Sequence, residues 1–213
     1  MPEPGATIAE TSRRLLALGA ATLGESGGRP MRAGIKAAWP GAALAAPAFP
    51  VRCTPGDNLA IHVAVARAPV GYALVVDVGT RRELGYWGEV LTTGAEARGL
   101  TGLVIDGCVR DAAALAAHGF SVFSTGLALP GATKELPGSV GAMATVGGVE
   151  VTLGDWVVGD VDGVTVVPGD ALAQVLAAGM ARAEKEAGMF AQLRGGATTV
   201  ELLSLDATPI EHA

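Results

Sequence analysis

The sequence predicts an α/β fold with a parallel-type front half, antiparallel strands in its C-terminal part and a long closing helix. Up to about residue 126, segments with helical spacing alternate with short apolar runs that end at glycine. Residues 139–170 then carry short Val/Thr runs separated by Gly-Asp and Asp-Gly pairs, a pattern typical of hairpins. Residues 168–193 follow as one long helix, which we expect to lie over these strands.

The elements of the front half follow in order. Residues 6–26 have apolar positions at helical spacing and end in glycines, so they predict a first helix. Residues 42–53 are apolar, but their prolines exclude a long helix and favour extended chain. Residues 58–68 predict a helix with Asp57 placed to cap it. Residues 72–79 are rich in β-branched side chains and predict a strand that ends in a glycine turn.

The segment from Gly85 to Asp111 is the most informative part of the chain. It predicts a helix at 89–99, a buried strand at 101–105 and a loop at 106–111. The helix 111–119 and the strand 120–126 follow this loop.

Polar groups gather at two corners of this segment, Gly88-Glu89 and Arg110-Asp111. The first N–H groups of a helix have no intrahelical partner and bind anions. An acid, a cation and free amides facing one crevice would suit a metal-bound keto acid.

The bulk composition limits the class of protein. The length of 213 residues fits one domain, and half of the residues are hydrophobic while only 4% are aromatic. A net charge of −6, without a Lys/Arg cluster, argues against nucleic acid as a partner. The N-terminus lacks the pattern of a signal peptide, and no window has the apolar length of a membrane span, so we expect a cytoplasmic protein. Cys53 and Cys108 lack metal-type spacing and are predicted to be buried free thiols.

Residues 85–111, followed by GDWVVGDVDGVTVVP at 154–168, resemble the RraA-like family. This family includes the regulators of ribonuclease activity A and the 4-hydroxy-4-methyl-2-oxoglutarate/4-carboxy-4-hydroxy-2-oxoadipate aldolases. The likeness spans roughly residues 15 to 200, so we expect a single RraA-like domain over residues 1–213. It implies a swivelling β/β/α sandwich, assembled as a homotrimer or hexamer with its sites at subunit interfaces.

The resemblance also implies a divalent metal, Mg²⁺ or Mn²⁺, that chelates the carboxylate and keto oxygen of a pyruvyl unit. Asp111 would hold this metal, and Arg110 would bind the keto or enolate oxygen. Glu89 would hydrogen-bond a water molecule on the metal and help to deliver a proton. Backbone N–H groups would bind the pyruvyl carboxylate, and the turn that offers them consists of Gly88, Glu89, Val90 and Leu91.

Further residues complete the implied site. Lys134 would line the pocket, while Glu25 and Glu186 would come from a neighbouring subunit. Glu25, Glu186 and water on the metal are therefore candidates for the acid and the base, with the two roles unassigned. The chain departs from the family at Ala114, where the enzymatic members usually carry Glu or Asp. The loss of that side chain would lower the metal affinity or the rate. A changed substrate, a compensating group from elsewhere in the protein, or lost activity would each explain this departure.

Each of these residues also has a purely structural interpretation. Asp111 has the position of a helix cap, Arg110 of a surface ion-pair partner and Glu89 of a first-turn acid. Lys134 lies in a polar loop, Glu186 in a charged helix and Glu25 in a polar turn. For other polar residues the structural interpretation is preferred. Turn formation is predicted for Asp77 and Asp106, core packing for His62, and a helix-end contact for His118.

Two classes of function remain. The first is a class II-type, metal-dependent lyase acting on pyruvyl-containing oxo acids, by aldol cleavage, by oxaloacetate decarboxylation or by both, with related enolate chemistry on another substrate as a variant. The second is a non-catalytic RraA-type regulator that binds an enzyme of RNA degradation. Ala114 favours the regulator, whereas the retention of Glu89 and Asp111 favours the lyase.

Overall fold

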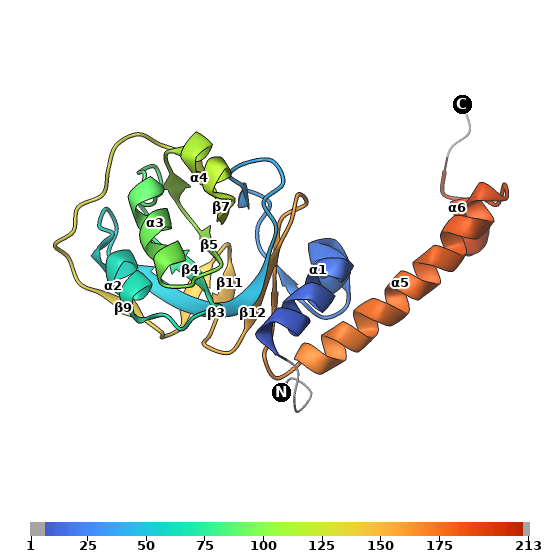
Figure 1. The fold of residues 1–213 in the computed structure, drawn as a ribbon. Helices are drawn as coiled ribbons and strands as arrows, with labels where there is room; N and C mark the ends of the chain where they lie inside the picture. The colour runs from blue at the N-terminus through green and yellow to red at the C-terminus, as the bar shows by residue number, and fades with distance from the viewer. Residues whose placement is uncertain (1–6, 211–213) are drawn as a thin grey trace.

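The structure is a computed structural model, and it describes residues 7–210. Its centre is a curled, mixed β-sheet with the strand order β1-β13-β12-β3-β4-β5-β7-β2, and β9 pairs with β3 beside this path (Figure 1). Four neighbouring strands are parallel: β3 (Leu44–Cys53), β4 (Ala73–Asp77), β5 (Gly102–Ile105) and β7 (Ser121–Ser124). The predicted parallel front half is therefore confirmed.

The C-terminal strands are antiparallel, as predicted. Strand β12 (Trp156–Gly159) pairs with β3 and with β13 (Val164–Val167), and β1 (Arg29–Pro30) closes that edge. Strands β10 (Ala144–Val146) and β11 (Val149–Val151) form a separate hairpin. The remaining strands are short: β2 (Lys36–Ala37), β6 (Cys108–Val109), β8 (Gly126–Leu127) and β9 (Gly138–Val140).

The helices form two groups on the sheet. Helices α2 (Leu59–Arg67), α3 (Glu89–Ala97) and α4 (Ala112–His118) cover one face of the parallel strands (Figure 1). Helices α1 (Ile8–Glu25) and α5 (Leu172–Arg194) pack together against β12 and β13. The short helix α6 (Thr199–Leu202) follows α5. Within residues 7–210, no helix combines the length and apolarity needed to cross a membrane.

Strand β4 shows how the sequence forms the core. Leu74 and Val76 pack beneath the helices, whereas Ala73 and Val75 point into the concave face that the β10–β11 hairpin closes. Successive side chains of a strand point to opposite faces, so a strand covered on both faces needs an uninterrupted apolar run. These four side chains are completely buried. The apolar run at 73–76 is thus explained.

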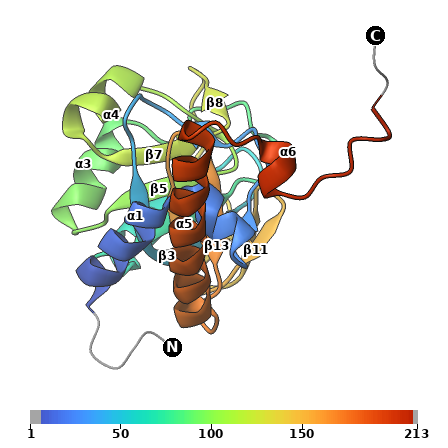
Figure 2. The same ribbon diagram turned by 90° about the vertical axis from the view of Figure 1, so that its right-hand side faces the viewer.

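The closing helix packs on the body with its first half. Its buried residues, Leu172, Val175, Leu176 and Gly179, all lie in its first half. Figure 1 shows the second half projecting from the body, and Figure 2, viewed from the side of the molecule opposite α3, shows α5 in front of the sheet. The apolar stripe ends where the charged run at 182–186 begins. The predicted closing helix is therefore present, and its first half lies over the C-terminal strands.

The two aspartates expected in turns behave differently. Asp77 Oδ1 accepts a hydrogen bond from Gly79 N at 2.8 Å, so the turn prediction is confirmed there. Asp106 is only 2% exposed and forms ion pairs with Arg32 and Arg82. The turn prediction is wrong for Asp106, because burial of its carboxylate requires charged partners from distant segments.

Candidate functional site

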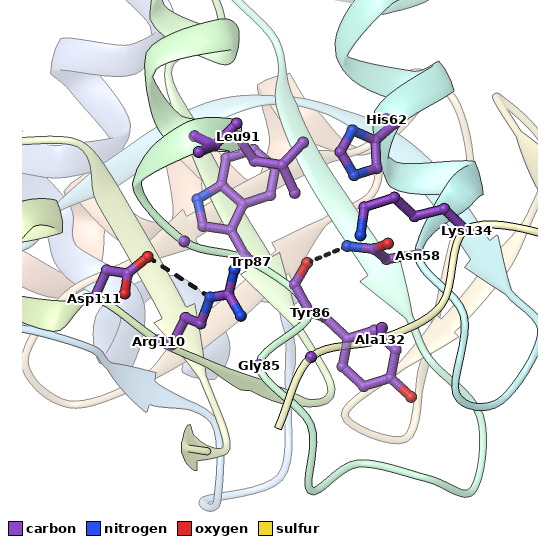
Figure 3. A pocket seen from close by; sticks show the side chains of 13 residues that line it. Asn58, His62, Gly85, Tyr86, Trp87, Leu91, Arg110, Asp111, Ala132 and Lys134 are labelled. Atoms are coloured by element: carbon purple, nitrogen blue, oxygen red, sulfur yellow. Dashed lines mark hydrogen bonds and ion pairs between the residues drawn. The ribbon is translucent and has the colours of Figure 1, made fainter. Parts of the chain in front are cut away.

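A pocket of about 210 Å³ lies beside the start of α3 (Figure 3). Four segments line it. They are the start of α2 with Asn58 and His62, residues 85–91 except Glu89, the pair Arg110 and Asp111, and the loop residues Gly131, Ala132 and Lys134. Most of the predicted site residues, from Gly88 to Lys134, therefore surround one cavity.

Asp111 connects the two predicted corners. Its Oδ2 atom accepts a hydrogen bond from Glu89 N at 3.1 Å, and its side chain makes no capping bond to its own helix α4. The carboxylate thus lies at the N-terminus of α3, where the helix dipole favours negative charge. Asp111 also has a positive φ of 60°, an uncommon conformation for a residue with a side chain. The cap interpretation therefore does not account for this side chain.

Gly88 permits this close approach. A Cβ atom built on Gly88 would lie 2.3 Å from Asp111 Oδ2, well inside van der Waals contact. The absence of a side chain at Gly88 is therefore a condition for placing the carboxylate beside the helix start.

Arg110 lies next to this carboxylate, with its Nε atom 3.7 Å from Asp111 Oδ2 (Figure 3). Its backbone N–H donates to Trp87 O at 2.8 Å, which ties the two corners together. The Arg110 side chain is 45% exposed, so the guanidinium remains accessible to a ligand in the pocket.

The residues present fit a divalent cation held by one protein carboxylate. Residues 7–210 contain no group of three or more His, Cys, Asp or Glu that would form a closed metal site. Mg²⁺, however, keeps several water molecules and often takes only one or two carboxylates from the protein. Asp111 borders the pocket, and its Oδ2 atom contacts Glu89 N and Arg110 Nε. A hard cation is therefore compatible with this position.

The turn residues contribute unequally to the pocket. Val90 and Leu91 line it, whereas Glu89 contributes its backbone N–H to Asp111. The Glu89 carboxylate is directed to α4, with Oε1 3.8 Å from His118 Nε2. His118 Nδ1 in turn lies 2.8 Å from a carboxylate oxygen of Glu96. His118 therefore connects α3 and α4 through carboxylates, which its predicted helix-end contact did not include.

His62, which the sequence assigned to core packing, lines the opposite end of the pocket with Asn58 and Lys134 (Figure 3). Burial, and secondly the charge of Lys134, lower the pKa of His62. The available signal was the spacing of Asn58 and His62, one helical turn apart at the start of α2. In the sequence, a helix face that lines a pocket has the same spacing as a helix face that packs in the core.

Asp57 holds this end of the pocket together. Burial alone would raise the pKa of its carboxyl group, but the hydrogen bonds that it accepts lower this pKa to about 2. The bond from Leu59 N at 2.8 Å supports the start of α2, although Asn58 occupies the cap position. Three further donors flank Lys134 in its loop, namely the Thr133 hydroxyl, Glu135 N and Leu136 N.

Glu25 and Glu186 lie outside the pocket of their own chain. Both form ion pairs with Arg182, which is part of α5. Figure 1 shows α1 and α5 on the far side of the sheet from α3. The structure thus brings these glutamates together with each other but not with Asp111.

Comparison with known proteins identifies the family of this chain. A family model described as RraA-like (Aldolase/RraA) matches residues 6–166. The chain belongs to the RraA-like family. This RraA-like chain is 35% identical, over 122 residues, to a protein of Halalkalibacterium halodurans that is provisionally named 4-hydroxy-4-methyl-2-oxoglutarate aldolase. The alignment covers 57% of this chain and 58% of that relative, so the chain spans less than two thirds of the relative's length.

Solved structures share the fold of this RraA-like chain. An uncharacterized protein from Pseudomonas syringae pv. tomato has a TM-score of 0.81 at 26% identity, covering 92% of this chain and 93% of that one. The RNA-processing inhibitor RraA from Thermus thermophilis has a TM-score of 0.64 at 25% identity, covering 70% and 92%. The predicted α/β fold class is therefore confirmed.

Proposed function

We propose that this chain is a divalent-metal-dependent lyase that acts on pyruvyl-containing oxo acids. Its reaction would be the retro-aldol cleavage of substrates such as 4-hydroxy-4-methyl-2-oxoglutarate, the decarboxylation of oxaloacetate, or both. One observation carries the proposal: Asp111, the guanidinium of Arg110 and the start of α3 meet at one pocket. The name of the Halalkalibacterium relative supports the same class of reaction.

The start of α3 would bind the pyruvyl carboxylate. The first N–H groups of a helix lack intrahelical acceptors, and the dipole adds positive potential there. Gly88, Val90 and Leu91 belong to this turn and line the pocket. A carboxylate at this position would direct the adjoining keto oxygen toward Arg110 and Asp111.

Both reactions break a C–C bond and leave negative charge on the keto oxygen. Arg110 would stabilise that charge, because its guanidinium borders the pocket beside Asp111. A divalent cation, Mg²⁺ or Mn²⁺, bound by Asp111 would supply Lewis-acid stabilisation of the same oxygen.

We further propose that the chain assembles as a homotrimer or hexamer. The second half of α5 projects from the body and carries Phe190, which is 49% exposed, and Met180 near the middle of the same helix is 54% exposed. A neighbouring subunit would cover these side chains, and its Glu25 and Glu186 would then lie near the pocket. Sedimentation analysis of the full chain tests the assembly, and a monomer at micromolar concentration would contradict it.

A turnover assay tests the lyase. Purified protein is given oxaloacetate, or a 4-hydroxy-2-oxo diacid, with Mg²⁺, and pyruvate is measured with and without EDTA. We expect EDTA and Asp111→Ala each to lower the rate by at least about 100-fold, because charge stabilisation of this kind contributes several kcal/mol. Glu150→Ala, on the exposed β10–β11 hairpin, is the matched control. Pyruvate formation that withstands both chelator and Asp111→Ala would contradict the proposal.

A non-catalytic regulator is the second candidate, and Ala114 is the observation that favours it. This residue lies in the first turn of α4, where a carboxylate would adjoin the metal in the enzymatic members. The similarity to the Thermus RNA-processing inhibitor supports the same candidate. A pull-down with an RNA-degrading ribonuclease tests it. Binding in the absence of turnover would favour the regulator.

A further inference from the structure

The end of the pocket opposite Asp111 contains polar atoms without partners. Asn58 Oδ1 and His62 Nε2 are buried, and neither makes a hydrogen bond within residues 7–210. Asn58 is only 5% exposed. Figure 3 shows the His62 ring directed toward Lys134 at this end of the pocket. A buried polar atom without a partner is unfavourable, so a ligand that satisfies these atoms gains affinity.

The two unpartnered atoms can both accept a hydrogen bond. Asn58 Nδ2 donates to Tyr86 O at 2.8 Å, which fixes the amide so that its remaining polar atom is the carbonyl oxygen. Burial and the charge of Lys134 lower the pKa of His62, which favours the neutral ring with one acceptor nitrogen, and in the Nδ1–H tautomer this nitrogen is Nε2. Two acceptors call for a donor such as a hydroxyl group.

The cationic groups indicate what accompanies this hydroxyl. Arg110 borders the pyruvyl end, and Lys134 borders the end with Asn58 and His62. A second carboxylate would therefore be paired by Lys134. The pocket matches a 4-hydroxy-2-oxo diacid better than oxaloacetate, because the keto form of oxaloacetate has no hydroxyl donor at that end.

We infer that His62 is a catalytic residue that takes the proton of the substrate hydroxyl during retro-aldol cleavage. This inference rests on the proposed lyase function and assigns hydroxylated oxo diacids as its substrates. His62 Nε2 gains the hydroxyl proton and the C4–O bond becomes a carbonyl. The C3–C4 bond breaks, and its electron pair forms the enolate whose charge lies on the keto oxygen beside Arg110. A proton from solvent then adds to C3 and completes pyruvate, and His62 returns to the neutral form by releasing its proton to solvent.

The other titratable side chains of the pocket are less suited to this role. Asp111 faces the proposed cation position, while Arg110 and Lys134 are cationic. The Tyr86 hydroxyl makes two hydrogen bonds to the backbone, and burial raises its pKa. Within the pocket of one described chain, His62 is therefore the best candidate for a neutral base.

Two substrates separate this role from a structural one. Aldol cleavage requires a base for the hydroxyl proton, whereas decarboxylation of oxaloacetate does not. We expect His62→Gln and His62→Leu to lower kcat for aldol cleavage by about 100-fold or more, the usual range for a general base. Decarboxylation should change by less than about threefold, because Arg110 and Asp111 remain. Added imidazole should partly restore aldol cleavage in His62→Ala.

Calorimetric binding of oxalate with Mg²⁺ provides a readout independent of turnover. Oxalate is too short to reach the end of the pocket that contains Asn58 and His62. Its affinity should therefore match the wild-type value in each folded His62 variant. Equal losses in both reactions, or no loss of aldol cleavage, would overturn the assignment of His62. Wild-type protein that decarboxylates oxaloacetate but does not cleave the hydroxylated diacids would also overturn it, while the lyase proposal would stand. Turnover of neither substrate would contradict both the assignment of His62 and the proposed lyase function.

Discussion

Asp57 provides a quantitative test of what stabilises the end of the pocket that contains Asn58, His62 and Lys134. Its carboxylate is 1% exposed and accepts hydrogen bonds from the start of α2 and from the loop that carries Lys134. These bonds lower its pKa from 3.8 to about 2 against the opposing effect of burial. At about 1.4 kcal/mol per pKa unit, the ionised form contributes roughly 2 kcal/mol to the free energy of unfolding.

The perturbation is Asp57→Asn, which removes the charge and keeps the shape. We expect it to lower the free energy of unfolding at pH 7 by about 2 kcal/mol or more, since the new amide also points hydrogens at backbone N–H groups. For a chain of this size the melting temperature should fall by about 4–8 °C. Urea unfolding and thermal scans measure both quantities, with Asp170→Asn at an exposed turn as the control.

The pH dependence has a defined sign. The native pKa is depressed, so the stabilisation is complete above about pH 4 and is lost as the pH falls from about 4 toward 2. The difference between wild type and Asp57→Asn should therefore shrink over that interval. A difference below about 0.5 kcal/mol at pH 7, or one that is constant from pH 6 to pH 2.5, would refute this account of Asp57.

Three further outcomes are expected. Gly88→Ala should lower turnover by at least about 100-fold, because the added Cβ would lie 2.3 Å from Asp111 Oδ2. The circular dichroism spectrum should stay unchanged, and turnover at the wild-type rate would contradict this prediction. Thr92→Val should cost about 1–3 kcal/mol in urea unfolding, because it leaves the buried Trp87 Nε1–H without its 2.7 Å acceptor; an unchanged midpoint would count against it. Burial raises the pKa of Cys53 to about 12, so iodoacetamide at pH 8 should label this thiol only after unfolding. Peptide mass spectrometry measures the labelling, and rapid labelling of the folded protein would disprove the burial argument.

The strands and the main corner of the site were predictable from local patterns. The apolar runs at 73–76 and 102–105 are buried on both faces, and burial of that kind leaves a continuous signal in the sequence. The meeting of Asp111 with the start of α3 was also predictable, because parallel strands deliver their following loops to one edge of the sheet.

Other features depend on partners that a single sequence does not specify. His62 lies on a helix face whose spacing is the same for a packed core and for a pocket wall. Asp106 is explained by Arg32 and Arg82, which come from separate segments of the chain. Within residues 7–210 the charged second half of α5 has no buried residue, and the helical pattern alone does not reveal that it projects.

The two ends of the pocket are formed by different kinds of chemical group. At the Gly88 end, main-chain amides and a carboxylate in close contact leave little room for substitution. At the other end, Asn58, His62 and Lys134 line the pocket. Hydrogen bonds to Asp57 hold the segments that carry these residues. Exchanges at Asn58 and Lys134 would alter which molecules are accepted while His62, Arg110 and Asp111 stay in place. Relatives with new substrates would therefore diverge there first, and laboratory evolution of this scaffold should begin at the same place.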